Sequence, residues 1–425
     1  MKIINGGVCA PKGFLAGGIR CGIKAASQKK DLAIIYSQKD CRACAMFTKN
    51  KVKAASVIVS QENIADGKLR AVIANSGNAN ACTGEEGMKA AKRMMQAAAG
   101  VLSIDPSDVA VASTGVIGLP LPIEVIEKNI ASIKNSLRSD GNADALEAII
   151  TTDTRKKEIA VEIEISGKPV KIGAMVKGSG MIHPNMATML GFITTDAAIA
   201  PSALDAALRR AVPRSFNRLT VDGDTSTNDM VVIMANGEAG NEEIGKQGTL
   251  INTDLRGLPE DDDFLIFYKA LEYVCVELTR MMARDGEGAT KLVTVTVTGA
   301  LAEETAETLA KSVASSSLVK AACFGADANW GRVLCAMGYA DAQQKQSAYF
   351  DPDKTDVSFK SGAGEILVCK SGQTVFFSEE KAKEILKEEE IEICININEG
   401  GSISVSVWGC DLTYDYVKIN GDYRS

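Results

Sequence analysis

The sequence contains a single histidine in 425 residues, His183. A serine or cysteine nucleophile activated by an imidazole would have to use that one residue, and a metal site built on several histidines is excluded. Acyl-transfer chemistry in this chain therefore needs a different base. A terminal amine is the simplest candidate, because its ordinary pKa of about 7.7–8.0 lets it accept a proton near neutral pH.

Other features of common protein classes are also missing. The glycine-rich segment 13–22 does not match G-x-G-x-x-G, and no Walker A pattern occurs, so a nucleotide-phosphate loop is not expected. No apolar run approaches the ~20 residues that span a membrane, and the N-terminus has no signal-peptide core. The net charge of −7, without a basic cluster, argues against nucleic acid as a partner. We therefore expect a cytoplasmic protein that binds neither membranes nor nucleic acids.

The eleven cysteines are odd in number and lack the spacing of a disulfide framework, which predicts free thiols in a reducing compartment. The only C-x-x-C, Cys41–Cys44, fits a redox pair or half of a zinc site, but no second pair completes four ligands, so we expect packing residues. The acidic turn at 222–224 resembles the start of a calcium loop, yet the positions that need Gly and Glu are Thr227 and Ile233. No metal site is predicted.

Hydrophobic residues make up 46% of the chain and charged residues 24%, which is enough apolar material for a sizeable core. The length suits two or three domains, or one large α/β unit with an appendage. Apolar runs and alternation predict strands at 32–36, 54–59, 70–74, 108–112, 159–165, 170–176, 189–193, 230–235, 292–297, 391–397 and 403–407. Helical spacing and caps predict helices at 85–101, 122–137, 142–150, 202–215 and 262–285, and from Glu303 onward. The polar segment 341–365 is expected to be an excursion on the surface.

The segment from Lys177 to Asp196 is the most informative part of the chain. Before the Ala187–Thr188 bond it is rich in glycine and turns sharply, and after that bond residues 189–193 form an apolar run typical of a strand. If the bond breaks, Thr188 carries a hydroxyl nucleophile together with a free α-amine that can activate it. The alternative is an ordinary glycine loop that leads into a core strand.

Other polar segments are candidates to complete a site. The turn Ser113-Thr114-Gly115 ends a strand and exposes backbone N–H groups and a hydroxyl, as an oxyanion hole requires, although such turns are also common in packing. Thr151–Thr154 is a second hydroxyl-rich cluster. Glu287 and Lys291 lie where the longest predicted helix gives way to a strand, a place where α/β folds often bind ligands.

The C-terminal tail is rich in side chains that are normally buried, namely Tyr414, Tyr416, Val417, Ile419 and Tyr423. Because chain ends usually fray, this composition predicts an ordered segment. A tail packed in this way can return to the pocket beside Thr188.

Several long motifs occur in order and together cover essentially the whole chain. They are Ser113–Gly115, Thr151–Thr154, Lys177–Leu190, Thr220–Asp229 and Gly409–Asn420. In this combination the chain resembles the ornithine acetyltransferase, or glutamate N-acetyltransferase, family of arginine biosynthesis. The polar segment 341–365 is long for that family.

The resemblance implies an α/β (α+β) fold of the four-layer α-β-β-α type, similar to the N-terminal-nucleophile hydrolases but with a different topology. Residues 1–285 would form the catalytic region, self-cleaved between Ala187 and Thr188. Residues 286–425 would form a smaller C-terminal α/β domain whose tail returns to the active site. The resemblance also implies that the cleaved fragments stay associated as a heterotetramer of two copies of each.

The activity implied by the resemblance is a ping-pong transfer of acetyl from N-acetylornithine to glutamate through an acetyl-threonine. Thr188 is the implied nucleophile, and Thr114 and Gly115 form the implied oxyanion hole. The implied substrate contacts are Thr151, Lys177, Thr188, Glu287, Asn420 and Ser425. No cofactor is implied, and the sequence leaves open whether acetyl-CoA also serves as a donor.

The chemistry of the substrates agrees with these roles. Both carry an α-carboxylate, which requires a cation such as Lys177, and the ornithine side chain carries an ammonium that Glu287 can attract. Two other functions remain open. One is a self-processing amidohydrolase or aminopeptidase of similar fold that uses water as the acceptor, and the other is a non-catalytic small-molecule-binding or assembly protein.

Overall fold

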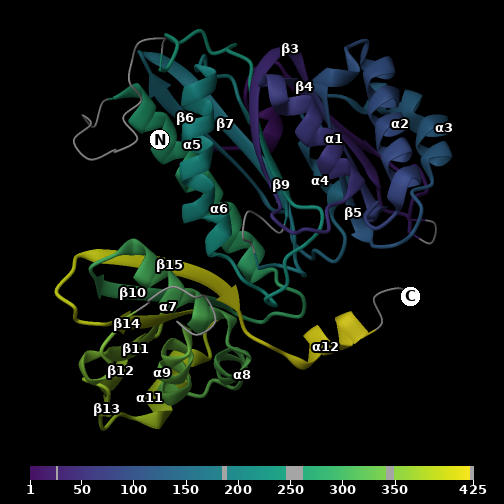
Figure 1. The fold of residues 1–425 in the computed structure, drawn as a ribbon. Coiled ribbons are helices and arrows are strands. Elements are labelled where there is room, and N and C mark those ends of the chain that lie inside the picture. The colour runs from purple at the N-terminus through teal and green to yellow at the C-terminus, as the bar shows by residue number, and fades with distance from the viewer. Residues whose placement is uncertain (25–26, 184–188, 246–261, 341–348, 422–425) are drawn as a thin grey trace. The chain divides into compact units, whose positions relative to one another are not determined.

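The computed structural model of the chain describes residues 1–24, 27–183, 189–245, 262–340 and 349–421. The chain forms two compact units, and each contains a sheet of its own (Figure 1). Unit 1 consists of Met1–Gly178, Pro184–Asn217 and Thr225–Leu278, and unit 2 of Ser179–His183, Arg218–Asp224 and Thr279–Ser425. The mixed α/β class is therefore as predicted. Among the described residues, no helix is long and apolar enough to cross a membrane.

Each unit consists of several separate segments of the sequence. The expected domains 1–285 and 286–425, in contrast, meet at a single boundary. The long C-terminal part of unit 2 starts at Thr279, inside a helix, and two short earlier segments belong to the same unit. One of these, Ser179–His183, leads directly to the segment that contains the predicted cleavage bond.

In the described part of unit 1, nine strands form one sheet in the order β1-β6-β7-β8-β9-β3-β4-β5, and β2 pairs with β3 outside that path. Their bounds are β1 Lys2–Ile4, β2 Phe14–Ile19, β3 Leu32–Phe47, β4 Lys68–Asn78, β5 Val109–Val116, β6 Glu158–Ile165, β7 Lys168–Lys177, β8 Leu190–Thr195 and β9 Met230–Ala235. β3 joins the two halves of the sheet, because its first part pairs with β4 and its second part with β9, with a register shift between Tyr36 and Cys41. The pairs β4–β5 and β8–β9 are parallel.

The helices described in unit 1 include α1 (Ala55–Asn63), α2 (Gly84–Leu102), α3 (Ile123–Ser136), α4 (Asn142–Ile149), α5 (Pro201–Arg214) and most of α6 (Asp263–Arg284). The segments 32–35 of β3, 71–74 of β4 and 109–112 of β5 are buried, as their continuous apolar sequences predict. On one face, residues such as Ile73 pack with α1, α2 and α3. On the other face, residues such as Val72 pack with α4 and with Phe192 and Val232 of the facing strands β8 and β9.

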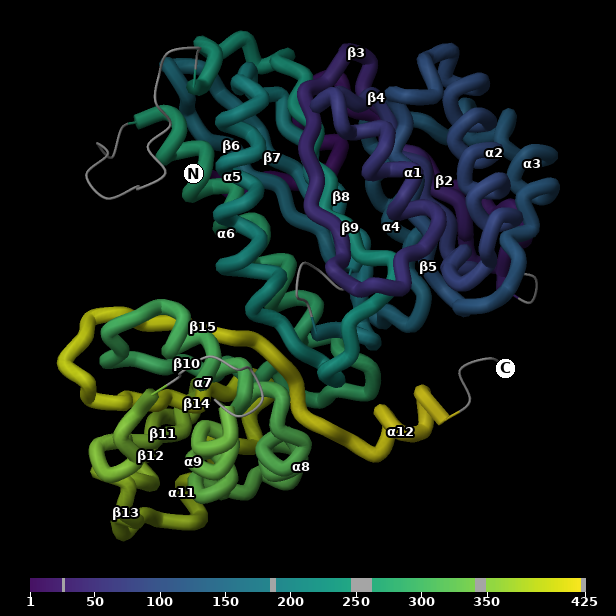
Figure 2. The backbone as a smooth tube through the Cα atoms, viewed as in Figure 1, coloured from purple at the N-terminus to yellow at the C-terminus, as the bar shows by residue number. Residues whose placement is uncertain are grey.

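The arrangement of unit 1 is therefore layered. α5 packs against β3, and Figure 2 shows α1 to α3 and α5 to α6 on opposite sides of the two sheet halves. The layers run helix, sheet, sheet, helix, in the order that the resemblance implies.

The prediction of a strand at 54–59 is wrong, because this segment begins helix α1. Its β-branched residues suggested a strand, but their burial against β5 decides the structure, as tertiary packing often does. Ser60 holds α1 against β5: its hydroxyl donates to the carbonyl of Val111 and accepts from the Val111 N–H, and both hydrogen bonds are 2.7 Å long. The helix predicted at 202–215 is α5, which begins one residue earlier, at Pro201 after Ala200.

In the described part of unit 2, six strands form a second sheet in the order β13-β12-β11-β14-β10-β15. The strands are β10 Leu292–Ala300, β11 Asp356–Ser361, β12 Gly364–Lys370, β13 Gln373–Thr374, β14 Glu390–Asn396 and β15 Ile403–Cys410, and the helices include α7 Glu303–Ser315, α8 Ser317–Gly325, α9 Trp330–Gly338, α11 Glu379–Leu386 and α12 Tyr414–Gly421. β10 follows the alternation of its sequence: Val293, Val295 and Val297 enter the core beside Leu309 of α7.

The expectation of a surface excursion at 341–365 holds only in part of the range. Residues 341–348 lie outside the described residues. Residues 356–361, however, form β11, which lies between β12 and β14 and buries Val357 and Phe359. The polar residues Asp356, Ser358 and Lys360 masked this alternation in the sequence.

Candidate active site

The predicted nucleophile and its cleavage partner, Thr188 and Ala187, lie outside the described residues, and so does Ser425. The remaining predicted site residues fall into two groups. Unit 1 contains Thr114, Gly115, Thr151 and Lys177, and unit 2 contains Glu287 and Asn420.

Thr114 and Gly115 lie inside β5, which continues to Val116, so the turn predicted at Ser113–Gly115 is wrong. Gly115 stands beside Gly77 near the end of the parallel pair β4–β5. Gly115 has a φ of +132°, and a Cβ atom there would collide with the backbone of Gly77, so only glycine fits. The register becomes irregular at Asn78, which aligns with both Thr114 and Val116. Regular pairing thus ends where the sequence predicts the oxyanion hole.

Lys177 is the last residue of β7, and its side chain reaches Thr114 in β5. The Lys177 ammonium donates a hydrogen bond to the Thr114 hydroxyl at a distance of 3.1 Å, and Lys177 is only 9% exposed. The fold therefore brings together two of the predicted site residues from distant parts of the sequence. A largely buried cation beside a hydroxyl creates a positive environment that favours a carboxylate or a developing oxyanion.

Asp153 lies beside these residues and was missed as a site residue in the sequence. Its Oδ1 accepts hydrogen bonds from the Lys157 ammonium (2.6 Å) and the Gly178 N–H (2.8 Å), and its Oδ2 accepts from the Thr151 N–H (3.1 Å). Burial alone would raise the pKa of this carboxyl, but the charges of Lys157 and Lys177 and the hydrogen bonds hold the pKa well below its usual range. The sequence did contain one signal for this role. Asp153 lies inside the hydroxyl-rich cluster Thr151–Thr154, and Lys157 follows it four residues later.

Lys24 is a second cation near this group, and no sequence pattern pointed to it. Its ammonium donates to the carbonyl of Ile150 over 2.8 Å, directly before Thr151. Its stem crosses Gly77, where an added Cβ atom would lie 2.6 Å from Lys24 Cγ. Burial, assisted by the positive charges of Lys29 and Lys177, lowers the pKa of Lys24 to about 8.

In unit 2, Glu287 is 7% exposed and lies against the segment Ser179–His183. Its N–H donates to the carbonyl of Ser179 over 2.9 Å, and a Cβ atom on Gly180 would collide with its carboxylate. Asn420 Nδ2 donates to Glu287 Oε2 over 2.8 Å. The two predicted residues of this unit are thus in direct contact.

Asp222 holds the same segment from another side. Its carboxylate accepts hydrogen bonds from the N–H groups of Met181 (2.6 Å) and Ile182 (2.8 Å). Burial raises the pKa of this carboxyl. His183 Nδ1 lies 3.1 Å from the Thr220 hydroxyl, and burial lowers the pKa of its imidazole. Asp222 therefore holds the main chain at Met181 and Ile182 in place.

In the part of the chain described, no group of three or more His, Cys, Asp or Glu residues is suited to a metal ion.

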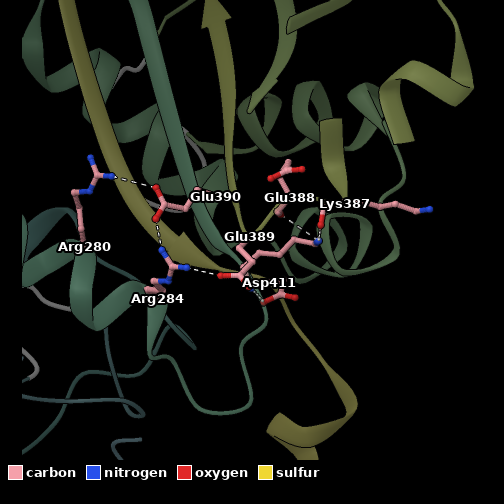
Figure 3. Close-up of polar contacts among 8 residues, drawn as sticks. Arg280, Arg284, Lys387, Glu388, Glu389, Glu390 and Asp411 are labelled. Atoms are coloured by element: carbon pink, nitrogen blue, oxygen red, sulfur yellow. Dashed lines mark hydrogen bonds and ion pairs between the residues drawn. The ribbon is translucent and has the colours of Figure 1, made fainter. Parts of the chain in front are cut away.

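Ion pairs and hydrogen bonds hold the segment 284–291, which contains Glu287, and Figure 3 shows the ion pairs of Arg284. Arg284, at the end of α6, pairs with Glu389 and Glu390. The Asp411 carboxylate accepts from the N–H groups of Thr290 (2.8 Å) and Lys291 (3.0 Å). The Lys291 ammonium donates to the carbonyls of residues 387 and 388, so this lysine supports the turn.

The tail differs from its prediction. α12 contains no buried residue in the described range, and Tyr414 and Val417 are 85% and 67% exposed. Only one face, with Tyr416 and Ile419, is partly buried, because a single short helix can turn only one side inward. The Tyr414 ring packs edge-on against Phe324, with centroids 5.7 Å apart.

All eleven cysteines are free thiols, and Cys82 and Cys335 among them are exposed. Cys41 is buried and Cys44 is partly buried. Burial raises the pKa of Cys41 to about 12 and also raises the pKa of Cys44, which favours the protonated thiol in both. This environment is consistent with the packing role expected for the pair.

Comparison with known proteins gives matches over the full chain. A family model described as the ArgJ family matches residues 15–425. The arginine biosynthesis bifunctional protein ArgJ of Caldanaerobacter subterraneus subsp. tengcongensis is 49% identical over 425 residues, and that of Symbiobacterium thermophilum is 49% identical over 426 residues, with 100% of both chains covered in each case.

Two solved structures are also similar in sequence. A crystal structure of arginine biosynthesis bifunctional protein ArgJ from Bacillus halodurans is 45% identical and covers 56% of this chain and 100% of its own, with a TM-score of 0.48. A structure of ornithine acetyltransferase complexed with ornithine from Mycobacterium tuberculosis is 38% identical and covers 44% of this chain and 99% of its own, with a TM-score of 0.41.

Proposed function

The chain belongs to the ArgJ family, and we propose from that membership that it transfers acetyl from N-acetylornithine to glutamate in arginine biosynthesis. The observation that carries this proposal is the 49% identity to an arginine biosynthesis bifunctional protein over the full length of both chains. The enzyme is an acyltransferase. Because the relatives are named bifunctional, acetyl-CoA is proposed as a second acetyl donor.

The proposed mechanism uses Thr188 as a nucleophile after the Ala187–Thr188 bond has been cleaved. Its hydroxyl attacks the acetyl carbonyl of N-acetylornithine and passes its proton to the α-amine of the same residue. The C–N bond then breaks, the proton goes to the leaving amine, and ornithine departs from an acetyl-threonine. The α-amine of glutamate attacks this ester in the same way and restores free Thr188. No cofactor is needed, since the protein itself carries the acetyl group.

Thr114 and Gly115 are the proposed oxyanion-hole residues. Two observations support this role: the glycine-only geometry of Gly115 beside Gly77, and the 3.1 Å hydrogen bond from Lys177 to Thr114. The bond polarises the Thr114 hydroxyl, which is then a better donor to a negatively charged oxygen. Both tetrahedral intermediates of the ping-pong reaction need such donors.

Substrate recognition is assigned to the residues that the family resemblance implies. Lys177 is proposed to bind the α-carboxylate that both substrates carry, with Thr151 as a neighbouring polar contact. Glu287 is proposed to attract the ornithine ammonium, and Asn420 to donate and accept hydrogen bonds at an amino-acid group. Ser425 is retained as a further proposed contact.

Self-cleavage, assembly and location complete the proposal. Cleavage at Ala187–Thr188 leaves β7 in one fragment and β8 in the other, yet these strands pair along Ile172–Lys177 and Leu190–Thr195. β3 and β9 pair across the same cut. These ladders favour two fragments that stay associated, and we propose a heterotetramer of two copies of each in the cytoplasm.

An acetyl-exchange assay on purified protein tests the proposal. Ornithine release from N-acetylornithine should depend on glutamate and match the N-acetylglutamate formed. A parallel reaction replaces N-acetylornithine with acetyl-CoA and tests the second donor. Ornithine release at the same rate without glutamate would show that water is the acceptor, and the enzyme would then be an amidohydrolase.

A further inference from the structure

We infer that Asp153 is a positioning residue that sets the geometry of both Thr151 and Lys177 for acetyl transfer. This inference rests on the proposed roles of those two residues as substrate contacts. It starts from a single carboxylate that is hydrogen-bonded to the two chain segments in which they lie.

The Asp153 carboxylate connects the end of α4 to the end of β7. One oxygen accepts from the N–H of Thr151 itself, and the other accepts from the N–H of Gly178, the residue that follows Lys177. Both bonds are made by backbone groups, so they fix the main chain at these positions. The orientation of the Lys177 side chain toward Thr114 depends on that main-chain position.

The pairing with Lys157 explains how a carboxylate can remain charged there. Both side chains are 0% exposed, and Lys157 Nζ lies 2.6 Å from Asp153 Oδ1. The carbonyl of Lys157 also accepts from the N–H of Val176, which adds a further link to the end of β7. The Lys157 ammonium therefore balances the buried charge of Asp153. The Lys157 main chain is hydrogen-bonded to β7, the strand that ends at Lys177.

Stability alone is a weak reason for this arrangement. A buried ion pair can often be replaced by neutral side chains without loss of stability, because its desolvation cancels much of the attraction. A neutral residue at 153, however, cannot make strong charge-assisted bonds to two backbone N–H groups at once. The charge is thus required for the connection between the two segments.

The direct test is a double variant, Asp153→Asn with Lys157→Met. Asp153→Asn alone removes the negative charge beside the buried Lys157 ammonium and can unfold the protein, whereas the double variant removes both charges. We expect the melting temperature of the double variant to lie above that of Asp153→Asn and below that of wild type, because the charges are gone but the two backbone hydrogen bonds are weakened. We expect kcat/KM for acetyl exchange to stay about tenfold to a hundredfold lower, because small displacements of binding groups have effects of this size.

The kinetic pattern separates positioning from general destabilisation. Partial unfolding lowers the apparent kcat but leaves KM unchanged, since the remaining folded molecules are normal. Displacement of Lys177 should raise KM for both N-acetylornithine and glutamate, as each carries an α-carboxylate, and should lower kcat through Thr114. Lys157→Met removes the cation that keeps the Asp153 carboxylate charged, so its KM values should rise in the same direction as those of the double variant.

Asp196 provides a matched control in the same unit. Its buried carboxylate also connects two backbone segments, by accepting from the N–H groups of Lys12 (3.0 Å) and Lys171 (2.8 Å), and neither of these partners is a proposed site residue. Asp196→Asn should lower the melting temperature while KM for both substrates stays within about twofold of wild type.

Two results would overturn the inference. A folded, cleaved double variant with wild-type KM and kcat would show that the ion pair is only structural. An uncleaved double variant would show that the carboxylate acts on processing instead of the assembled site. Failure of the proposed function itself is distinct, because wild-type protein would then show no glutamate-dependent ornithine release.

Discussion

Asn420, in the tail helix α12, donates a hydrogen bond to the carboxylate of Glu287 over 2.8 Å, across 133 residues of sequence. Glu287 is 7% exposed, and its N–H donates to the carbonyl of Ser179. The tail thus provides a hydrogen bond to a largely buried carboxylate. This contact makes the functional role of the tail open to experiment.

Glu287→Gln should act on one substrate more than on the other. The variant keeps the shape of the side chain and removes the charge proposed to attract the ornithine ammonium. A hydrogen bond to a charged group contributes about 1.5–3 kcal/mol, so KM for N-acetylornithine should rise roughly tenfold to a hundredfold. KM for glutamate, whose side chain is an anion, should change little. Steady-state kinetics with each substrate varied in turn measure both values, and equal increases would refute this assignment.

Deletion of residues 420–425 should leave self-cleavage largely intact and abolish acetyl transfer. Processing is expected to need only the geometry near the cleaved bond, whereas transfer needs the complete site. Asn420→Ala alone leaves the Glu287 carboxylate without one donor, at a cost of roughly 1–3 kcal/mol, and should raise KM. Gel analysis and exchange kinetics on the same preparations check both results. A cleaved truncation with wild-type kcat/KM would reduce the tail to a structural role.

Thr114→Ala should lower kcat by about a hundredfold or more and change KM much less. The Thr114 hydroxyl is proposed to donate mainly to the tetrahedral intermediate, so its loss affects the transition state more than the bound substrate. Initial-rate measurements over a range of both substrates separate the two constants. A loss confined to KM would identify Thr114 as an ordinary substrate contact.

Lys24 predicts a pH dependence of stability. Its pKa is lowered from 10.5 to about 8, chiefly by burial. Between these values the unfolded chain binds more protons than the folded chain, so the contribution of Lys24 to stability rises with pH across that window. The melting temperature of Lys24→Met minus that of wild type should therefore fall as pH increases from 8 to 10.5. A difference that does not vary with pH would contradict the burial of this ammonium.

Patterns that depend on local burial were predictable from the sequence. The valines of β10 alternate with threonines, and the structure places the valines in the core. The continuous apolar run at 230–235 predicted β9 with the same bounds. Most strands and helices of both units follow from patterns of this kind.

Features that depend on distant partners were not predictable in the same way. The segment 54–59 has a strand-like composition but packs as a helix on β5, a partner far away in the sequence. The tyrosines of the tail predicted burial, yet Tyr414 is exposed because α12 turns only one face inward. Asp153 and Asp222 each accept hydrogen bonds from backbone N–H groups. A single sequence does not show which backbone groups a carboxylate will contact.

The acetylated state of Thr188 tests the central claim most directly. Purified protein is incubated with N-acetylornithine alone, and the fragments are analysed by intact mass and N-terminal sequencing. The account predicts a fragment that begins Thr-Met-Leu-Gly, gains the mass of one acetyl group on Thr188, and loses it when glutamate is added. Thr188→Ala should remain one uncleaved, unacetylated chain. An active wild-type protein that is uncleaved, or that carries its acetyl group on another residue, would contradict the account.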